Sequence, residues 1–290
     1  MSATLSVIIP TLDEAETLPA LLADLHAQTG LVLQIIVADG GSRDGTPGLA
    51  LAAGAQLQTS PRGRARQMNA GRRLATAAHL LFLHADSRLP DPQLLARALA
   101  SLQACADPRV AGHFGLRFIR HQPGRERFYR FLEAKTRSQR PGTINGDQGL
   151  LLRASWFDQL GGFDESLPYL EDQHFAATVF RYGRWLLLPG ELHTSARRFE
   201  QEGHGRRYAL MGLMSAMHTL GLRAFFDAAP GIYVAQSETH ELRLGPYLRL
   251  AARLIVTRPR CWWPLLRLGL ANAWQLGLAL RIRLGRHPGR

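Results

Sequence analysis

Three short apolar segments constrain the fold of this chain more than any other feature. They are Leu5–Pro10, Gln34–Ala38 and His79–His84. Uninterrupted apolar runs of this length are typical of strands that are buried on both faces, as in parallel sheets. An aspartate follows each run within three residues, so the same kind of polar group recurs where each expected strand ends.

Helical patterns separate these segments. Leucines recur at i, i+3, i+4 and i+7 from Leu18, and Asp13 with Glu16 resembles a capping box before them. Thr46 is expected to cap a second helix, and Arg64–Ala78 to form a third. Strands that alternate with helices predict a doubly wound α/β sheet.

The aspartates after the strands give the first functional signal. Ligands bind at the carboxyl ends of the strands in doubly wound sheets. We expect Asp13, Asp39 and Asp86 to gather at that edge. For Asp13, helix capping is the preferred interpretation, which leaves Asp39 and Asp86 as candidates for ligand contact.

The pattern becomes more mixed after about residue 105. The expected elements are strands at Val110–Ile119, Gly146–Arg153 and Trp185–Leu188, and helices at Arg125–Arg137, Glu171–Arg181 and Tyr208–Leu222. From Leu242 onward, apolar and arginine-bearing helical stretches alternate. We expect a catalytic domain over 1–225 and a basic, helical C-terminal region over 226–290.

The formal net charge of +12 is unevenly placed. Ten arginines and a single acid, Glu241, lie between residues 241 and 290. Such a region suits phosphate, nucleic acid or anionic lipid.

The two cysteines, Cys105 and Cys261, form no metal or redox pattern, and no signal peptide is visible, so we expect a cytoplasmic protein.

Two common phosphate-binding motifs are missing. The segment PTLDE after the first strand holds no G-x-G-x-x-G, which argues against a dinucleotide site, and no Walker A sequence occurs. The glycines of Gly40–Gly45 have neither spacing.

Four motifs in register resemble a known family. SVIIPTLDE, VADGGSRDGT, LFLHADSRLP and LEDQHFA look like family-2 glycosyltransferases of the GT-A fold. SPRGRARQMNAG, HADS, GDQ and SARRFEQEG together resemble the bacterial subgroup associated with radical-SAM and selenodomain gene neighbourhoods. The resemblance covers residues 5–225. It implies a Rossmann-like, nucleotide-diphospho-sugar transferase architecture, with a mostly parallel sheet flanked by helices.

The resemblance implies a donor pocket at the first two strand ends. Asp39 would contact the base and ribose of the nucleotide, and a carboxylate can accept hydrogen bonds from both. The alternative is that Asp39 only caps its turn. The residues expected to line the same pocket are Pro10, Thr11, Glu14 and Gly41.

Asp86 matches the last residue of the family's D-x-D motif, which holds a divalent cation on the donor diphosphate. Here the motif is His84-Ala85-Asp86, so its first acid is replaced. One carboxylate, diphosphate oxygens and water can complete a Mg²⁺ or Mn²⁺ site. His84 is a poor ligand for Mg²⁺ and is expected to contact the nucleotide. The alternative is a merely polar strand end.

Basic residues are expected on the donor phosphates. The resemblance places Arg66 and Asn69 near the donor, and Arg198 near its diphosphate. Arginine suits bidentate phosphate contact. An exposed helix in an arginine-rich chain would look the same, so that alternative stays open for Arg66 and Asn69.

Glu171-Asp172 matches the family's catalytic motif. Inversion at the anomeric carbon needs a base that takes the proton of the acceptor hydroxyl, and Asp172 matches that position, with Glu171 in support. Asp147 would bond the acceptor. The alternative is that acids are simply favoured in the first turn of a helix.

These observations predict an inverting glycosyltransferase that uses a UDP- or GDP-sugar and a divalent cation. The sequence leaves the acceptor open. One alternative is a GT-A-like sugar nucleotidyltransferase, but PTLDEAET has no glycine-rich basic loop. The other is a non-catalytic basic binding protein. Nucleic acid is not expected as a partner, because the acids cluster where phosphates would be repelled.

The C-terminal region suggests a membrane surface. Pro264–Leu280 is apolar but interrupted by Arg267 and Asn272, with Trp262 and Trp263 before it. An arginine inside a spanning helix is costly, so an interfacial helix is favoured over a span. We expect peripheral attachment to the inner face of the cell membrane, which suits a lipid-linked acceptor. Packing on the domain or on a second subunit is the alternative.

Overall fold

The computed structural model describes residues 4–228 and 242–285. The chain forms two compact units: Met1–Ile119 with Glu133–Thr194, and Arg120–Leu132 with Ser195–Arg290. The predicted boundary at residue 225 stays a prediction. Glu241 lies outside the described residues.

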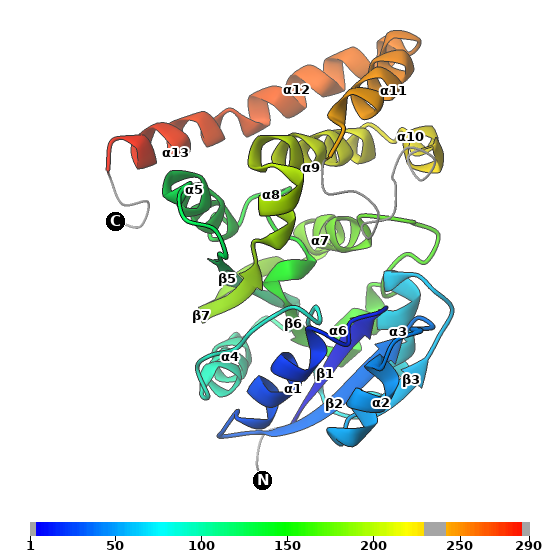
Figure 1. The fold of residues 1–290 in the computed structure, drawn as a ribbon, viewed down its shortest axis with the longest axis vertical. Helices are drawn as coiled ribbons and strands as arrows, with labels where there is room; N and C mark the ends of the chain where they lie inside the picture. The colour runs from blue at the N-terminus through cyan, green and yellow to red at the C-terminus, as the bar shows by residue number, and fades with distance from the viewer. Residues whose placement is uncertain (1–3, 229–241, 286–290) are drawn as a thin grey trace. The chain divides into compact units, whose positions relative to one another are not determined.

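The first unit is built on a seven-stranded sheet with the order β3-β2-β1-β4-β6-β5-β7 (Figure 1). Its strands are β1 (Thr4–Thr11), β2 (Val32–Asp39), β3 (Gln56–Thr59), β4 (His79–Phe82), β5 (Val110–Ile119), β6 (Leu150–Arg153) and β7 (Arg184–Ser195). β1 pairs in parallel with β2 and β4, and β2 with β3. β6 runs antiparallel to β4 and β5. The prediction of a mostly parallel α/β sheet is confirmed.

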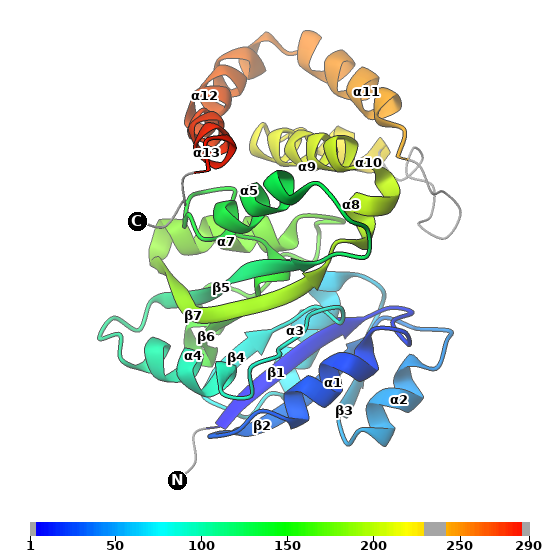
Figure 2. The same ribbon diagram turned by 60° about the vertical axis from the view of Figure 1, so that its left-hand side comes forward.

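Helices cover both faces of this sheet (Figure 2). They are α1 (Leu18–His26), α2 (Thr46–Ala52), α3 (Arg64–Leu74), α4 (Leu94–Gln103), α6 (Ala154–Gln159) and α7 (Glu171–Tyr182), while α5 (Glu126–Thr136) is shared between the units. One buried cluster joins α1 and α4 to the sheet, and a second joins α3, α6 and α7 to its other face. The contact of α3 with β1 needs Gly71, because a Cβ there would lie 2.5 Å from Ile8 Cγ2.

The second unit is helical. It holds α8 (Arg197–Glu202), α9 (His204–Thr219), α10 (Arg223–Ala228), α11 (Leu244–Val256), α12 (Trp262–Asn272) and α13 (Trp274–Arg283). The predicted C-terminal helices are therefore confirmed. Within the described ranges, none of the helices has the length and apolar character that a membrane span requires.

Several local expectations were wrong. Asp13 and Glu16 form no capping box, because α1 begins only at Leu18 and Thr17 is its N-cap. Thr46 lies inside α2, whose N-cap is Gly45.

Strand boundaries also differ from the sequence pattern. The edge strand β3 was not expected, because QLQT lacks an apolar run. Gly146–Arg153 is not one strand: a 3-10 turn (Gly146–Gln148) precedes β6, and Gly149 between them has φ +66°. The positive φ of Gly149 interrupts the extended backbone, so the acceptor-side turn precedes β6 instead of forming part of it.

Candidate active site

The loops that follow β1 and β2 are bonded to each other. The backbone N–H of Asp13 donates to Ser42 Oγ at 2.9 Å, and the N–H of Arg43 donates to Asp13 Oδ1 at 2.7 Å. Ala15 N–H donates to Asp44 Oδ2 at 3.0 Å. Asp13 therefore ties two strand-end loops together instead of capping a helix. These bonds give the carboxyl edge of the sheet a fixed rim.

Asp39 is buried at the end of β2, with 2% of its surface exposed. Its Oδ2 accepts the N–H groups of Gly41 and Ser42, both at 2.9 Å. Its Oδ1 accepts the hydroxyls of Ser42 at 2.5 Å and Thr11 at 3.2 Å. Burial opposes the charge, but these hydrogen bonds outweigh it and lower the pKa of Asp39. A carboxylate offers about four acceptor positions, so its own turn and the Thr11 hydroxyl together fill them.

The other predicted donor residues lie around this turn. Pro10 and Thr11 end β1 and are buried. Gly41 has φ +92°, a left-handed conformation that favours glycine. Glu14 accepts a hydrogen bond from Thr17 Oγ1 at 2.6 Å. All four residues lie at the carboxyl edge of the sheet, as the sequence predicted.

Gln67 supports these loops from below, a role that the sequence analysis missed. Its Nε2 donates to the carbonyl oxygens of Thr11 at 2.5 Å and Ala38 at 3.0 Å. A Cβ on Gly40 would lie 2.9 Å from its side chain. Only its place on the inner face of α3 would have indicated this.

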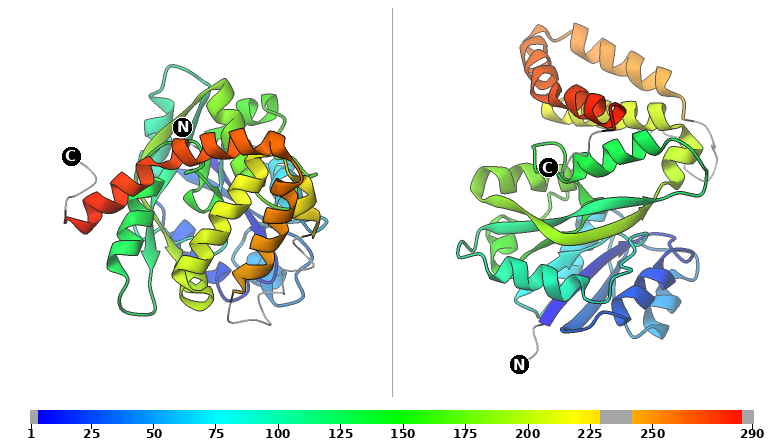
Figure 3. Two further views of the ribbon diagram at one scale, coloured as in Figure 1. Left: turned by 90° about the horizontal axis from the view of Figure 1, so that it is seen from above. Right: turned by 90° about the vertical axis from the view of Figure 1, so that its left-hand side faces the viewer.

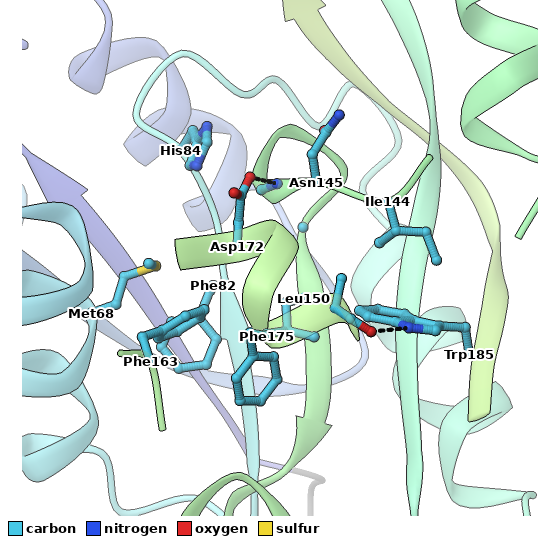
Figure 4. A pocket seen from close by; sticks show the side chains of 13 residues that line it. Met68, Phe82, His84, Ile144, Asn145, Leu150, Phe163, Asp172, Phe175 and Trp185 are labelled. Carbon is cyan, nitrogen blue, oxygen red and sulfur yellow. Dashed lines mark hydrogen bonds between the residues drawn. The ribbon is translucent and has the colours of Figure 1, made fainter. Parts of the chain in front are cut away.

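A second group of polar side chains lies around Gly146, and Figure 4 shows two of them, His84 and Asp172. The Gly146 N–H donates to Asp172 Oδ2 at 2.6 Å. His84 Nδ1 lies 2.8 Å from Asp147 Oδ1. A Cβ on Gly146 would meet His84 Nε2 at 2.5 Å and Asp172 Oδ2 at 3.2 Å. The loop thus holds a histidine and two carboxylates from three elements around one glycine.

Glu171 and Arg64 add a buried acid and its cation. Glu171 is 3% exposed, and its Oε1 lies 3.5 Å from the NH1 atom of Arg64. Burial raises the pKa of Glu171, and the charge of Asp172 adds to that rise, whereas Arg64 opposes it. For Arg64 desolvation opposes the charge, but the acids Glu171, Asp172, Asp147 and Asp86 outweigh it and raise its pKa. Arg64 is therefore the cation that faces this acidic group.

The sequence resemblance singled out Arg66 rather than Arg64. Residues i and i+2 of a helix point in different directions, so only one of the two arginines at the start of α3 faces the acids. Arg66 is exposed and has no hydrogen bond or ion pair within the described residues. No motif marks Arg64; its place as the first residue of α3 is what brings it to the acids.

Asn69 holds a loop. Its Nδ2 donates to Phe163 O and to Glu165 Oε1, both at 2.9 Å, and its Oδ1 accepts the Phe163 N–H at 3.0 Å. Both ends of the amide are thus engaged. Arg198 lies in α8 of the second unit, so its predicted contact with the donor diphosphate stays a prediction.

The donor set at Asp86 fits a cation only when a ligand supplies the rest. No group of three or more histidine, cysteine, aspartate or glutamate side chains within the described ranges could hold a metal ion. Asp86 is partly exposed and makes no hydrogen bond to another described residue, and His84 is engaged with Asp147. A single open carboxylate suits Mg²⁺ or Mn²⁺ that takes its other oxygens from a diphosphate and water.

Beneath these polar groups lies a small apolar cavity of about 20 Å³. In Figure 4, Met68, Phe82, Phe163 and Phe175 lie on one side of Asp172, and His84 on the other. The cavity has room for about one water molecule. Its lining includes both the apolar side chains of the core and the polar residues His84, Asn145 and Asp172.

The chain is similar in sequence to proteins of known function. The chain is 38% identical over 102 residues to proteins named PGL/p-HBAD biosynthesis glycosyltransferase in Mycobacterium tuberculosis and Mycobacterium bovis. This match covers 33% of the chain and 40% of those proteins, so the chain spans well under half the length of the curated relatives it matches.

Two solved structures resemble the fold. The mannosyltransferase PcManGT from Pyrobaculum calidifontis, in complex with GDP-Man and Mn²⁺, aligns with a TM-score of 0.55 at 20% identity, over 97% of this chain and 74% of that one. TarS 1–349 of S. aureus, in complex with UDP-GlcNAc, aligns with a TM-score of 0.53 at 18% identity, over 75% and 66%. Both indicate a GT-A-like fold. Residues 6–161, more than half of the chain, match the family described as Glycosyl transferase family 2, and the chain belongs to that family.

Proposed function

We propose that the protein is an inverting glycosyltransferase that transfers a sugar from a UDP- or GDP-sugar to an acceptor hydroxyl. The observation that carries this proposal is the convergence of Asp172, Asp147 and His84 on Gly146, with Asp86 and Arg64 beside them. These three carboxylates have different surroundings, which suits three roles: Asp172 as the base, Asp86 as the cation ligand and Asp147 as the acceptor contact.

Asp172 is the proposed base. The Gly146 N–H holds Asp172 Oδ2 and the Gln173 N–H holds its Oδ1 at 2.7 Å, so the carboxylate is oriented through both oxygens. As the acceptor oxygen bonds to the anomeric carbon, the bond from that carbon to the diphosphate breaks and Asp172 takes the hydroxyl proton. Attack from the side opposite the leaving group inverts the configuration.

Glu171 and Arg64 would set the charge around this base. Burial raises the pKa of Glu171 and Arg64 opposes that rise, so the Arg64 cation would balance the acidic charge beside Asp172. Asp147 and His84 would hold the acceptor and the nucleotide, respectively, through a loop that Gly146 lets approach closely.

The donor would lie along the rim formed by the first two strand ends. Asp39 would bond the base or ribose once one of its two hydroxyl partners rotates away, with Pro10, Thr11, Glu14 and Gly41 around it. Arg66 and Arg198 remain the proposed phosphate contacts, and Asn69 would become one if its Nδ2 released Glu165. A cation at Asp86 would stabilise negative charge on the leaving diphosphate.

The choice of UDP or GDP is supported by the ligands of the two structural neighbours, UDP-GlcNAc and GDP-Man. We also propose membership of the radical-SAM and selenodomain-associated subgroup. The acceptor proposed is lipid-linked or otherwise part of the cell envelope, with the enzyme at the cytoplasmic face of the membrane.

Replacement of Asp172 tests the mechanism. Asp172→Asn keeps the shape of the side chain but removes the base, so turnover should fall by about 10²–10⁴-fold, the usual contribution of a general base. Donor affinity should stay close to that of the wild type. Asp227→Asn, an exposed aspartate outside the first unit, is the matched control.

Two outcomes would reject this mechanism. Unchanged turnover in Asp172→Asn would move the base elsewhere. A product whose NMR spectrum shows the donor's anomeric configuration retained would exclude single-step inversion.

A further inference from the structure

The last two helices leave one side uncovered. α12 has no buried residue, and α13 has only Ile282. In Figures 1 and 3 these helices follow one another as an extended arm of the second unit. Among the described residues, the large apolar side chains exposed on this arm are Trp262, Trp263, Leu266, Leu270, Leu276 and Leu280.

The opposite side of the arm is already held within the same unit. Tyr208 of α9 donates its hydroxyl to Gln275 Oε1 at 2.5 Å, and Gln275 Nε2 donates to Asn272 Oδ1 at 2.8 Å. Leu265 and Leu268 lie half-buried on this inner side. The arm therefore has a fixed inner side and a second apolar stripe that faces away from it.

Helical spacing places the exposed apolar side chains of each of the two helices on one side of that helix. Trp263, Leu266 and Leu270 are spaced by three and four residues, and Leu276 and Leu280 by four. Their exposed fractions reach 67% at Leu270 and 76% at Leu276. On α12, Trp262, Leu266 and Leu270 line one shared apolar hollow. A clustered exposed apolar surface of this kind marks an interaction site rather than ordinary surface.

Charge decides what partner this stripe fits. Arg260, Arg267, Arg281 and Arg283 are exposed on or beside the arm, and residues 242–290 contain no aspartate or glutamate. A second copy of the chain would bring arginines against arginines. An anionic lipid surface offers apolar chains to the leucines and negative headgroups to the arginines.

We propose that the outer stripe of α12 and α13 binds an anionic membrane with the helices parallel to its surface. Trp262 and Trp263 lie at the headgroup level, where indoles are favoured. The indole N–H of Trp262 donates to Ile255 O at 3.3 Å, which fixes that ring at the end of α11. This surface deepens the membrane location proposed above, and its test uses no transfer activity, so the catalytic proposal and this one fail independently.

Vesicle flotation with the full chain tests the surface. The wild type should float with phosphatidylcholine vesicles that contain phosphatidylglycerol, less so at high salt, and should stay behind with phosphatidylcholine alone. Leu270→Glu with Leu276→Glu should abolish flotation, because both side chains leave water on binding. Leu51→Glu, which is 58% exposed in α2, is the matched control and should float like the wild type.

A second variant separates charge from apolar contact. Arg281→Gln with Arg283→Gln should lower the partition coefficient on anionic vesicles by about tenfold or more, since each arginine contributes at such a surface. A wild type that does not float with anionic vesicles would overturn the proposal. So would flotation of the double glutamate variant, or a dimer in vesicle-free solution that the same two glutamates dissociate.

Discussion

At the scale of single residues, Gly146 explains how the acceptor-side loop reaches the base. Its N–H holds Asp172, and its missing side chain leaves room for His84. The sequence motifs did not predict this role of Gly146, because motifs list side chains and the group that bonds Asp172 is a backbone N–H. The close packing of three side chains around it became visible only in the structure.

Gly146→Ala should displace one of these neighbours. The added Cβ would lie 2.5 Å from His84 Nε2, which is closer than side chains come, so either the ring or the loop must shift. We expect kcat to fall because Asp172 is displaced. Donor affinity should fall less, because a shift of His84 disturbs one proposed nucleotide contact while those at the first two strand ends are untouched. Steady-state kinetics measures this. Gly48→Ala, which meets no atom within 4 Å, is the control; an equal loss in both variants would contradict the role given to the loop.

Arg64→Gln should destabilise the protein in a pH-dependent way. The folded-state pKa of Glu171 is raised, so the folded protein keeps a proton that the unfolded chain releases above about pH 4.5. Loss of Arg64 raises this pKa further, and the added loss of stability is present at neutral pH and disappears below about pH 4.5. The difference in unfolding temperature between the variant and the wild type, measured at about pH 4 and again at about pH 7.5, tests this pH dependence.

Arg66→Gln removes the same charge from an exposed position two residues away and serves as the control. Its unfolding temperature should differ from that of the wild type by a similar, small amount at both pH values. A loss of stability in Arg64→Gln that does not depend on pH would contradict the assigned pairing with Glu171.

At the scale of elements, the loops after β1 and β2 act as one structure. Asp13 accepts the Arg43 N–H and Asp44 accepts the Ala15 N–H, so hydrogen bonds cross between the two loops. The sequence predicted that Asp13 and Asp39 share one edge, because parallel strands with helical crossovers require it. It did not predict their partners, because loop hydrogen bonds depend on the exact backbone path.

Asp39→Asn separates the two interpretations of that residue. An amide cannot accept four hydrogen bonds, so the unfolding temperature should fall in any case. If Asp39 also contacts the nucleotide, donor affinity measured by calorimetry on the folded variant should fall as well. A stability loss with unchanged donor affinity would leave Asp39 as a turn cap only. Asp107→Asn, in an exposed loop paired with Arg109, is the control.

Apolar patterns in the sequence predicted the buried strands but not the edge strand or the orientation of side chains on α3. The buried runs gave β1, β2 and β4 correctly, since continuous burial leaves a strong apolar signal. The edge strand β3 has no such signal, because it is only partly covered. The helix start at Arg64 was predicted, but the orientation of Arg64 toward the acids depends on which side of α3 packs on β1.

At the scale of the whole molecule, a family-2 unit and a basic helical unit share one chain. The first contains the proposed chemistry, and the second contains the proposed membrane surface. The sequence predicted this combination from motif order and from the arginine excess near the C-terminus. The acceptor could not be predicted, because specificity depends on the shape of the acceptor pocket rather than on motifs.

The central claim is that Asp86 and its neighbours bind a nucleotide sugar together with a divalent cation. A thermal-shift panel of UDP- and GDP-sugars, with and without Mn²⁺, tests it most directly, on the wild type, on Asp86→Ala and on the Asp227→Ala control. At least one nucleotide sugar should raise the unfolding temperature of the wild type in a Mn²⁺-dependent way; a ligand at 100 times its Kd adds about 2.7 kcal/mol of stability. Asp86→Ala should stay folded and lose this shift, whereas Asp227→Ala should keep it. The absence of any shift in the wild type, or an equal Mn²⁺-dependent shift in Asp86→Ala, would contradict the account.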